Sequence, residues 1–240
     1  MQQVSALYTQ LLSQLNHHFD VKVVVDGTEY TESTIVTLAT NISVFKYGPE
    51  VGGTPSQEVD CVLRNPGRSF PRMASIQPYV RAVGILNGVE TKSEWVPQGK
   101  FFADTRDFTE NDGGIVTCTI HGYDAMLKAE RTTSNWLPAF IGTDIAIVQF
   151  IAASMGVEID SRTYEVLTGR YRINIPTAGI WKYTFREVLS FIAAKYLGFF
   201  YITDEGKLLL LSLLSLPEDI GRLINELGNN ITFGGTRILV

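Results

Sequence analysis

Residues 93–128, SEWVPQGKFFADTRDFTENDGGIVTCTIHGYDAMLK, contain the change of pattern that decides the fold. Residues 115–121 alternate with a two-residue period, which is typical of a half-buried strand. Before them, residues 111–114 (Asn-Asp-Gly-Gly) tolerate left-handed backbone angles, as a tight reversal between two strands requires. After them the period changes, and residues 125–128 are typical of the first turns of a helix with Asp124 as its N-cap. The stretch therefore predicts a β-rich part that ends here and a helix-containing part that begins here.

Upstream of this point, residues 19–124 carry strand patterns with no helical pattern between them. Asp26-Gly27 and Asn87-Gly88 are the dipeptides that favour two-residue hairpin turns. A series of short strands joined by turn chemistry favours a barrel or a sandwich. The strands are expected at residues 21–25, 28–30, 35–45, 57–64, 79–86, 89–96, 101–108 and 115–121.

The first residues of the chain predict an amphipathic helix within residues 1–18. Its apolar side chains recur at spacings of three and four, which places them in one stripe. Such a stripe either packs on its own domain or docks on a neighbouring subunit. The candidate interface residues are this stripe and one tryptophan: Val4, Leu7, Tyr8, Leu11, Leu12, Leu15 and Trp95.

Residues 125–228 change to an α+β pattern. A helix is expected over residues 144–155, ended by Gly156. Thr184 and Glu187 form a capping box ahead of another helix, with Gly198 as its C-terminal cap. The remaining elements are a strand at 170–175, a hairpin of 199–203 with 208–213, a helix at 215–227 and a terminal β segment within 229–240.

The composition excludes some classes of protein. Charged residues make up 19%, hydrophobic residues 45%, and the net charge is −5. A dedicated nucleic-acid binder would usually be basic. No apolar run approaches the ~20 residues that span a bilayer, and no signal peptide is recognisable, so synthesis and folding in the cytoplasm are expected. Cys61 and Cys118 both lie in strand patterns and are expected to be buried free thiols.

The search for catalytic, cofactor-binding or metal-binding residues assigns none. The three histidines, His17, His18 and His121, have no partner at metal-ligand spacing. The acidic cluster Asp104, Asp107, Glu110 and Asp112 lacks the ligand spacing of a calcium loop. The glycine-rich residues 48–54 are not followed by the Lys-Ser/Thr of a phosphate-binding loop, and no nucleophile elbow is present. We therefore expect no enzyme and no cofactor.

Three stretches resemble the baseplate hub proteins of contractile phage tails. They are residues 94–102 (EWVPQGKFF), 122–128 (GYDAMLK) and 183–211 (YTFREVLSFIAAKYLGFFYITDEGKLLLL). The family includes prophage-encoded tail proteins of Firmicutes and contractile bacteriocins. The resemblance implies a tail-tube-like β-barrel at residues 19–124 followed by an α+β domain at 125–228. It also implies a ring in a virion or phage-tail-like particle, made in the host cytoplasm. The implied partners are the tail tube protein, the central spike protein and other baseplate proteins, with no membrane and no specific nucleic-acid binding.

The sequence departs from this family in one respect. Members usually carry a second tube-like barrel, so that a trimer presents six barrels to a six-fold tube, and little follows Leu227 here to build one. A homotrimer is favoured and a hexamer is the alternative. Two rival functions stay open: a tail-associated peptidoglycan hydrolase, and a carbohydrate- or receptor-binding β module. The second would be marked by exposed, coplanar tryptophans, for which Trp95, Trp136 and Trp181 are the candidates.

Overall fold

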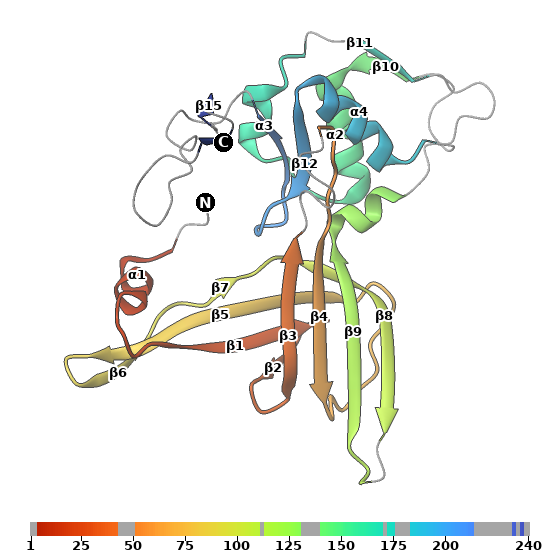
Figure 1. Cartoon of the computed structure of the whole chain (residues 1–240). Helices are drawn as coiled ribbons and strands as arrows, with labels where there is room; N and C mark the ends of the chain where they lie inside the picture. Colours follow the sequence, from red (N-terminus) through yellow and green to blue (C-terminus); the bar gives the residue numbers. More distant parts are fainter. Residues whose placement is uncertain are drawn as a thin grey trace.

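The structure is a computed structural model of the chain, and it shows a curled β-sheet with a cluster of helices and short strands at one end (Figure 1). It describes residues 4–42, 51–110, 113–130, 140–169, 172–175, 183–213, 232–233 and 236–237. The helix expected at 215–227, Trp136 and Trp181 lie outside these residues.

The sheet is antiparallel and nine-stranded, with the order β2-β1-β5-β8-β9-β4-β3, while β6 and β7 also pair with β5. Two of its hairpins turn where the sequence predicts. Asp26 and Gly27 join β1 to β2, Asn87 and Gly88 join β5 to β6, and all four residues have positive φ. The strands are β1 (His18–Val25), β2 (Thr28–Thr31), β3 (Ile35–Ile42), β4 (Gln57–Arg64), β5 (Ser75–Leu86), β6 (Val89–Lys92), β7 (Val96–Pro97), β8 (Phe101–Glu110) and β9 (Val116–Asp124).

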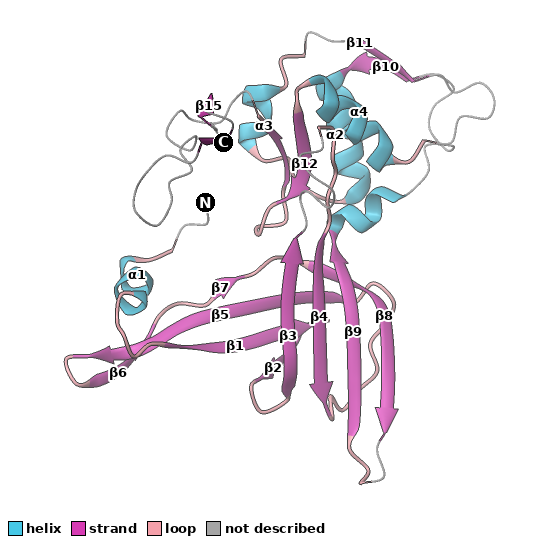
Figure 2. Cartoon of the chain, in the orientation of Figure 1, coloured by secondary structure: helices cyan, strands magenta, loops and turns pink. Residues whose placement is uncertain are grey.

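The sheet folds over its own core at the contact between β5 and β8. These strands pair only through Ser75 with Phe102 and Ile76 with Phe101, so the sheet turns a corner there. β1 and β5 consequently cross the layer of β3, β4, β9 and β8 at a steep angle (Figure 2). Buried side chains from both layers fill the space between them, among them Val23, Tyr30, Val59, Cys61, Leu63, Ile76, Phe101, Cys118 and Ile120. Both cysteines are buried and free, as expected.

The expected closed barrel is wrong. Within the described strands, β2 pairs only with β1 and β3 pairs only with β4, so the sheet stays open between its two ends. The reason is local. β2 has only four residues, and a turn in which the Thr34 N–H donates to the Thr31 carbonyl leads the chain straight into β3. The chain therefore moves away from β2 before a ladder between β2 and β3 can form.

The α+β part has a core of its own, built mainly from two helices and a hairpin. The capping box of Thr184 and Glu187 is confirmed at the start of α4, and Gly156 ends α2 in a left-handed conformation. The elements are η1 (Ala125–Glu130), β10 (Phe140–Thr143), α2 (Asp144–Met155), α3 (Ser161–Val166), β11 (Arg172–Ile175), α4 (Phe185–Lys195), β12 (Gly198–Ile202) and β13 (Leu208–Ser212). A short pair, β14 (Thr232–Phe233) and β15 (Thr236–Arg237), follows near the end of the chain.

Three local predictions need correction. The helix expected to begin at residue 125 is the short 3-10 helix η1, although Asp124 does accept a hydrogen bond from the Met126 N–H at 2.9 Å, as an N-cap should. The left-handed residue after α4 is Leu197, not Gly198. Gly198 is required instead because a Cβ there would lie 2.2 Å from the Leu211 carbonyl oxygen of the paired strand. The expected strand 89–96 is split into β6 and β7.

Candidate interaction surfaces

The N-terminal helix α1 (Ala6–Leu12) is shorter than the predicted stripe, and it lies against β5. Leu11 is fully buried there, whereas Leu7 and Tyr8 are half-buried. Val4 and Leu12 are about two-fifths exposed and Leu15 is fully exposed. The helix ends at Leu12, so Leu15 lies beyond it and outside the predicted helical stripe. The interface role of all seven candidates stays a prediction.

Polar contacts of the residues before and after α1 attach it to β5 and to the segment that follows β6. Ser5 caps the helix and donates to the Glu94 carboxylate from its N–H at 2.7 Å and from its hydroxyl at 2.6 Å. The Gln14 side chain accepts from the Ile85 N–H at 3.1 Å and donates to its carbonyl at 2.9 Å. Since β1 pairs with β5 only as far as Val83, Gln14 replaces the missing strand at Ile85. The helix therefore packs on its own sheet, which was one of the two alternatives.

Trp95 is held between two cations rather than presented as a flat exposed surface. Lys22 Nζ lies 4.8 Å and Arg81 Cζ 4.3 Å from its ring centroid. Arg81 also donates twice to Asp20, at 2.6 and 2.9 Å, and Lys92 donates to the same carboxylate at 3.1 Å. Burial raises the pKa of Asp20, but these hydrogen bonds outweigh it and hold the pKa below its usual value. This arrangement fixes the tryptophan ring as a packing element.

The outer face of the layer β3-β4-β9-β8 is polar and open to solvent. Alternate residues of these strands face the core, so their neighbours in sequence face outward. We define the outer face as Thr37, Ala39, Asn41, Glu58, Asp60, Val62, Arg64, Thr105, Asp107, Thr109, Thr117, Thr119, His121 and Tyr123, which the register aligns in rows across the strands. In one row, His121 Nδ1 lies 2.7 Å from Asp60 Oδ1. The His121 ring also meets the Tyr123 ring edge to face at 4.8 Å. Carboxylates outnumber the single arginine on this face.

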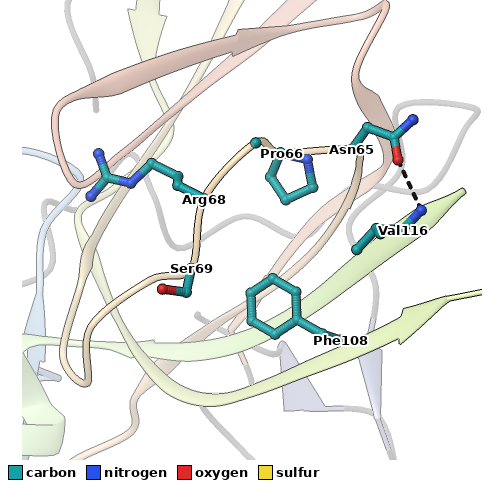
Figure 3. Close-up of a pocket in the computed structure, with 7 residues that line it drawn as sticks. Asn65, Pro66, Arg68, Ser69, Phe108 and Val116 are labelled. Carbon is teal, nitrogen blue, oxygen red and sulfur yellow. Dashed lines mark hydrogen bonds between the residues drawn. The ribbon is translucent and has the colours of Figure 1, made fainter.

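An open apolar pocket of about 420 Å³ lies at the end of the sheet away from the α+β part (Figures 1 and 3). It is lined by the loop that follows β4 and by the ends of β8 and β9. In Figure 3, Pro66 and Phe108 face each other across the hollow. The lining residues are Asn65, Pro66, Gly67, Arg68, Ser69, Phe108 and Val116. Sequence reasoning missed this pocket, because nothing in the pattern of residues 64–72 shows that the loop meets β8.

A buried carboxylate and an arginine join the sheet to the α+β part. Asp124, the last residue of β9, is only 1% exposed and accepts from the Gln57 N–H and the Met126 N–H, each at 2.9 Å. Burial raises its pKa to about 6 against the opposing effect of these hydrogen bonds and of Arg186. Arg186 on α4 donates to the Thr54 carbonyl at 2.6 Å and to the Ser56 hydroxyl at 2.8 Å. The α+β part is thus fixed to the strand ends.

In the described part of the chain, no three His, Cys, Asp or Glu side chains come together as metal ligands would. Of the suspected acidic cluster, Asp112 lies outside the described residues. No helix in the described ranges is long and apolar enough to cross a membrane.

Comparison of the sequence with protein families and with curated proteins finds no match. Comparison of the structure does find similar folds. A 43 kDa tail protein of prophage MuSo2 from Shewanella oneidensis matches with a TM-score of 0.54 and 14% identity, over 91% of this chain and 62% of that protein. The chain thus has the fold of a prophage tail protein and spans about three-fifths of that protein's length.

Two further structures resemble the chain more distantly. A tail protein from Neisseria meningitidis MC58 matches with a TM-score of 0.47 and 14% identity, over 83% of this chain and 52% of that one. A chain of the Francisella PdpA-VgrG complex matches with a TM-score of 0.45 and 12% identity, over 81% of this chain and 31% of that one.

Proposed function

We propose that this chain is a structural baseplate hub component of a contractile phage tail or phage-tail-like particle. It would form a ring that joins the end of the tail tube to the central spike. The observation that carries the proposal is the fold shared with the MuSo2 tail protein across nearly the whole chain. The resemblance of residues 94–102, 122–128 and 183–211 to hub proteins supports the same role.

The open sheet fits a subunit of a ring. Edge strands such as β3 expose backbone groups that can pair with another chain, and closed cyclic symmetry satisfies all copies of such an edge at once. Several side chains of β3 are exposed, with Val36 half-exposed. We favour a homotrimer, with a hexamer as the alternative. In this proposal residues 19–124 form the tube-like domain and residues 125–228 the added α+β domain.

The outer face supports a particular orientation in the ring. A channel through which DNA passes should not retain phosphates, because each neutralising contact adds salt-dependent affinity. Glu58, Asp60 and Asp107 make the outer face more acidic than basic, so we propose that it lines the channel. The partners would be the tail tube protein, the central spike protein and other baseplate proteins.

The proposal is tested by isolating the particle that contains this chain. Affinity purification of a tagged chain from induced host cells should recover tube and spike proteins in stoichiometric amounts. Cryo-electron microscopy of the recovered particle should place the outer face toward the channel. A chain that purifies alone, or a channel lined mainly by Lys and Arg, would contradict the hub role. Zymography on peptidoglycan tests the rival hydrolase, for which a lytic band abolished by a single carboxylate substitution is required.

A further inference from the structure

The tip of the β5–β6 hairpin carries an asparagine followed by a glycine. Asn87 and Gly88 are both exposed, and the tip projects from the sheet in Figure 1. In this dipeptide the backbone nitrogen of the glycine can attack the side-chain carbonyl carbon of the asparagine, because glycine has no Cβ to crowd the approach. A Cβ built on Gly88 would meet no described atom within 4 Å. The dipeptide is therefore open to water and to this reaction.

The other asparagines in the described ranges lack this combination. Asn65 precedes a proline, whose nitrogen carries no hydrogen, and its Oδ1 accepts from the Val116 N–H at 2.8 Å. Three more precede histidine or isoleucine, whose side chains crowd the backbone nitrogen: Asn16, Asn41 and Asn174. The Asn87 side chain has no hydrogen-bond partner among the described residues. Asn87 is thus the described asparagine whose side chain is both free and followed by glycine.

The β1–β2 turn provides an internal comparison with an acid in place of the amide. Asp26 and Gly27 have positive φ, as Asn87 and Gly88 do. Arg68 donates to the Asp26 carboxylate at 2.6 Å. A carboxylate held in this way is a poor target for a nucleophile, so we expect the β1–β2 turn to remain unchanged.

The folded turn opposes the reaction at Asn87. The φ values of 52° at Asn87 and 79° at Gly88 are those of a type I′ turn. In the left-handed region ψ is about +47°, which directs the next backbone nitrogen away from the side chain. The reacting atoms can meet only when the turn opens and Asn87 leaves this conformation. The rate therefore depends on how often the hairpin opens.

Gln14, just after α1, is placed to control this opening. Its side chain accepts from the Ile85 N–H at 3.1 Å and donates to the Ile85 carbonyl at 2.9 Å. Ile85 pairs with Glu90 across the hairpin, next to the pair of Leu86 with Val89 that closes the turn. An opening that extends beyond the closing pair must therefore break both hydrogen bonds of Gln14.

We propose that Asn87 is a deamidation site and that Gln14 limits its rate by holding the hairpin closed. The Gly88 nitrogen forms a bond to Asn87 Cγ and gives its proton to water. The bond from Cγ to the side-chain nitrogen breaks, and this nitrogen takes up a proton and leaves as ammonia. A water molecule then opens the resulting succinimide ring at one of its two carbonyl carbons. The net change consumes one water and releases one ammonia.

The two products affect the hairpin differently. Opening of the ring at Cγ gives aspartate, which a turn of this type accommodates, as Asp26 shows. Opening at the backbone carbonyl gives isoaspartate, which adds one atom to the main chain. The length of the turn sets the register of a hairpin, so isoaspartate should break the pairing of Leu86 with Val89. The reaction would thus loosen the tip as the protein ages.

Peptide mass spectrometry of the full-length protein, incubated at mildly alkaline pH, tests the site. We expect the mass increase of an amide-to-acid exchange at Asn87, with an isoaspartate product separated by chromatography, and no change at Asn41 or Asn65. The same protein unfolded in urea should convert faster, because its turn is always open. If the unfolded chain converts while the folded chain stays unchanged throughout the incubation, Asn87 is not a site in the folded protein.

Two glutamine variants test the control of the rate. Gln14→Ala should accelerate conversion of the folded protein roughly tenfold, because two hydrogen bonds that resist opening are lost. Gln10→Ala makes the same change at an exposed side chain of α1 and should react at the wild-type rate. In urea all three proteins should react equally. Equal rates for the two folded variants would overturn the role of Gln14.

The effect of the product is measured separately. Asn87→Asp should unfold at the same urea concentration as the wild type, whereas the isoaspartate fraction of aged protein should unfold at a lower one. The same midpoint for the isoaspartate fraction and for Asn87→Asp would overturn the argument from turn length.

Discussion

Replacing Asp124 by Asn should remove a pH dependence of stability that this one buried carboxyl group creates. Burial raises its pKa from 3.8 to about 6. Because the folded-state pKa lies above the unfolded one, its stabilising contribution is fully present below about pH 4 and is lost as the pH rises through about 6. A rise of about 2 pKa units, at ~1.4 kcal/mol each, corresponds to about 3 kcal/mol, of which about 2 kcal/mol falls between pH 4 and 7.

The assay is urea denaturation of the wild-type protein and of Asp124→Asn at several pH values across this range. We expect the unfolding free energy of the variant, minus that of the wild type, to grow by about 2 kcal/mol as the pH rises from 4 to 7. All other titrating groups are common to the two proteins, so their contributions cancel. A difference that stays constant within about 0.5 kcal/mol refutes the reasoning. A difference that shrinks would show that Arg186 and the two N–H donors stabilise the anion more than burial destabilises it.

Three further predictions concern stability and can be measured by the same denaturation assay. Arg186→Met should cost about 2–4 kcal/mol, because the Thr54 carbonyl loses its donor. Arg68→Met, which removes an exposed pair with Asp26, should cost under about 1 kcal/mol, and equal losses in the two variants would contradict the role of Arg186. Gly198→Ala should cost about 3 kcal/mol or more because its Cβ would lie 2.2 Å from the Leu211 carbonyl oxygen. In Gly206→Ala the new Cβ would meet nothing closer than 3.9 Å, so this change should cost only about 1–2 kcal/mol for its left-handed backbone. A larger loss for Gly206→Ala than for Gly198→Ala would refute the role of the Leu211 contact. Leu11→Ala should cost about 2–4 kcal/mol and Leu12→Ala less than about 1 kcal/mol, since only Leu11 is fully buried; similar values would mean that α1 does not pack as described.

The sequence predicted local features wherever a few neighbouring residues determine the outcome. Asn87-Gly88 requires two left-handed residues, and Thr184 with Glu187 caps α4 through contacts three residues apart, so both were recognisable. The change from sheet to helix-containing structure at residue 124 was visible for the same reason. The end of α1 at Leu12 was missed, because spacing alone does not show where a helix stops without a capping residue.

Features that depend on distant segments were not predictable from pattern alone. Closure of the sheet depends on whether β2 pairs with β3. The two-residue alternation shows which side chains share a face of the sheet, but not which strands pair at its edges. Gly198 is read as a helix cap from its position, although its role is the close approach of Leu211. The pocket requires residues 65–69 to meet Phe108 and Val116, and no local signal marks that meeting. Hydrophobic periodicity identifies which side chains are buried, but it does not show which distant segment each of them packs against.

The segment between β3 and β4 has a consequence for how the chain acquires its fold during synthesis. The Gly52 N–H donates to the Gly198 carbonyl at 2.8 Å, and the Phe200 N–H donates to the Gly53 carbonyl at 3.1 Å. During synthesis, Gly52 and Gly53 leave the ribosome long before their partners on β12 have been made. The curled sheet can assemble around its own core as soon as β9 emerges, but this segment must wait for about 80 further residues, several seconds at ordinary elongation rates. Recombination that joined residues 1–124 to a different C-terminal part would remove the partners of Gly52 and Gly53. We therefore expect the two parts of the chain to be inherited together.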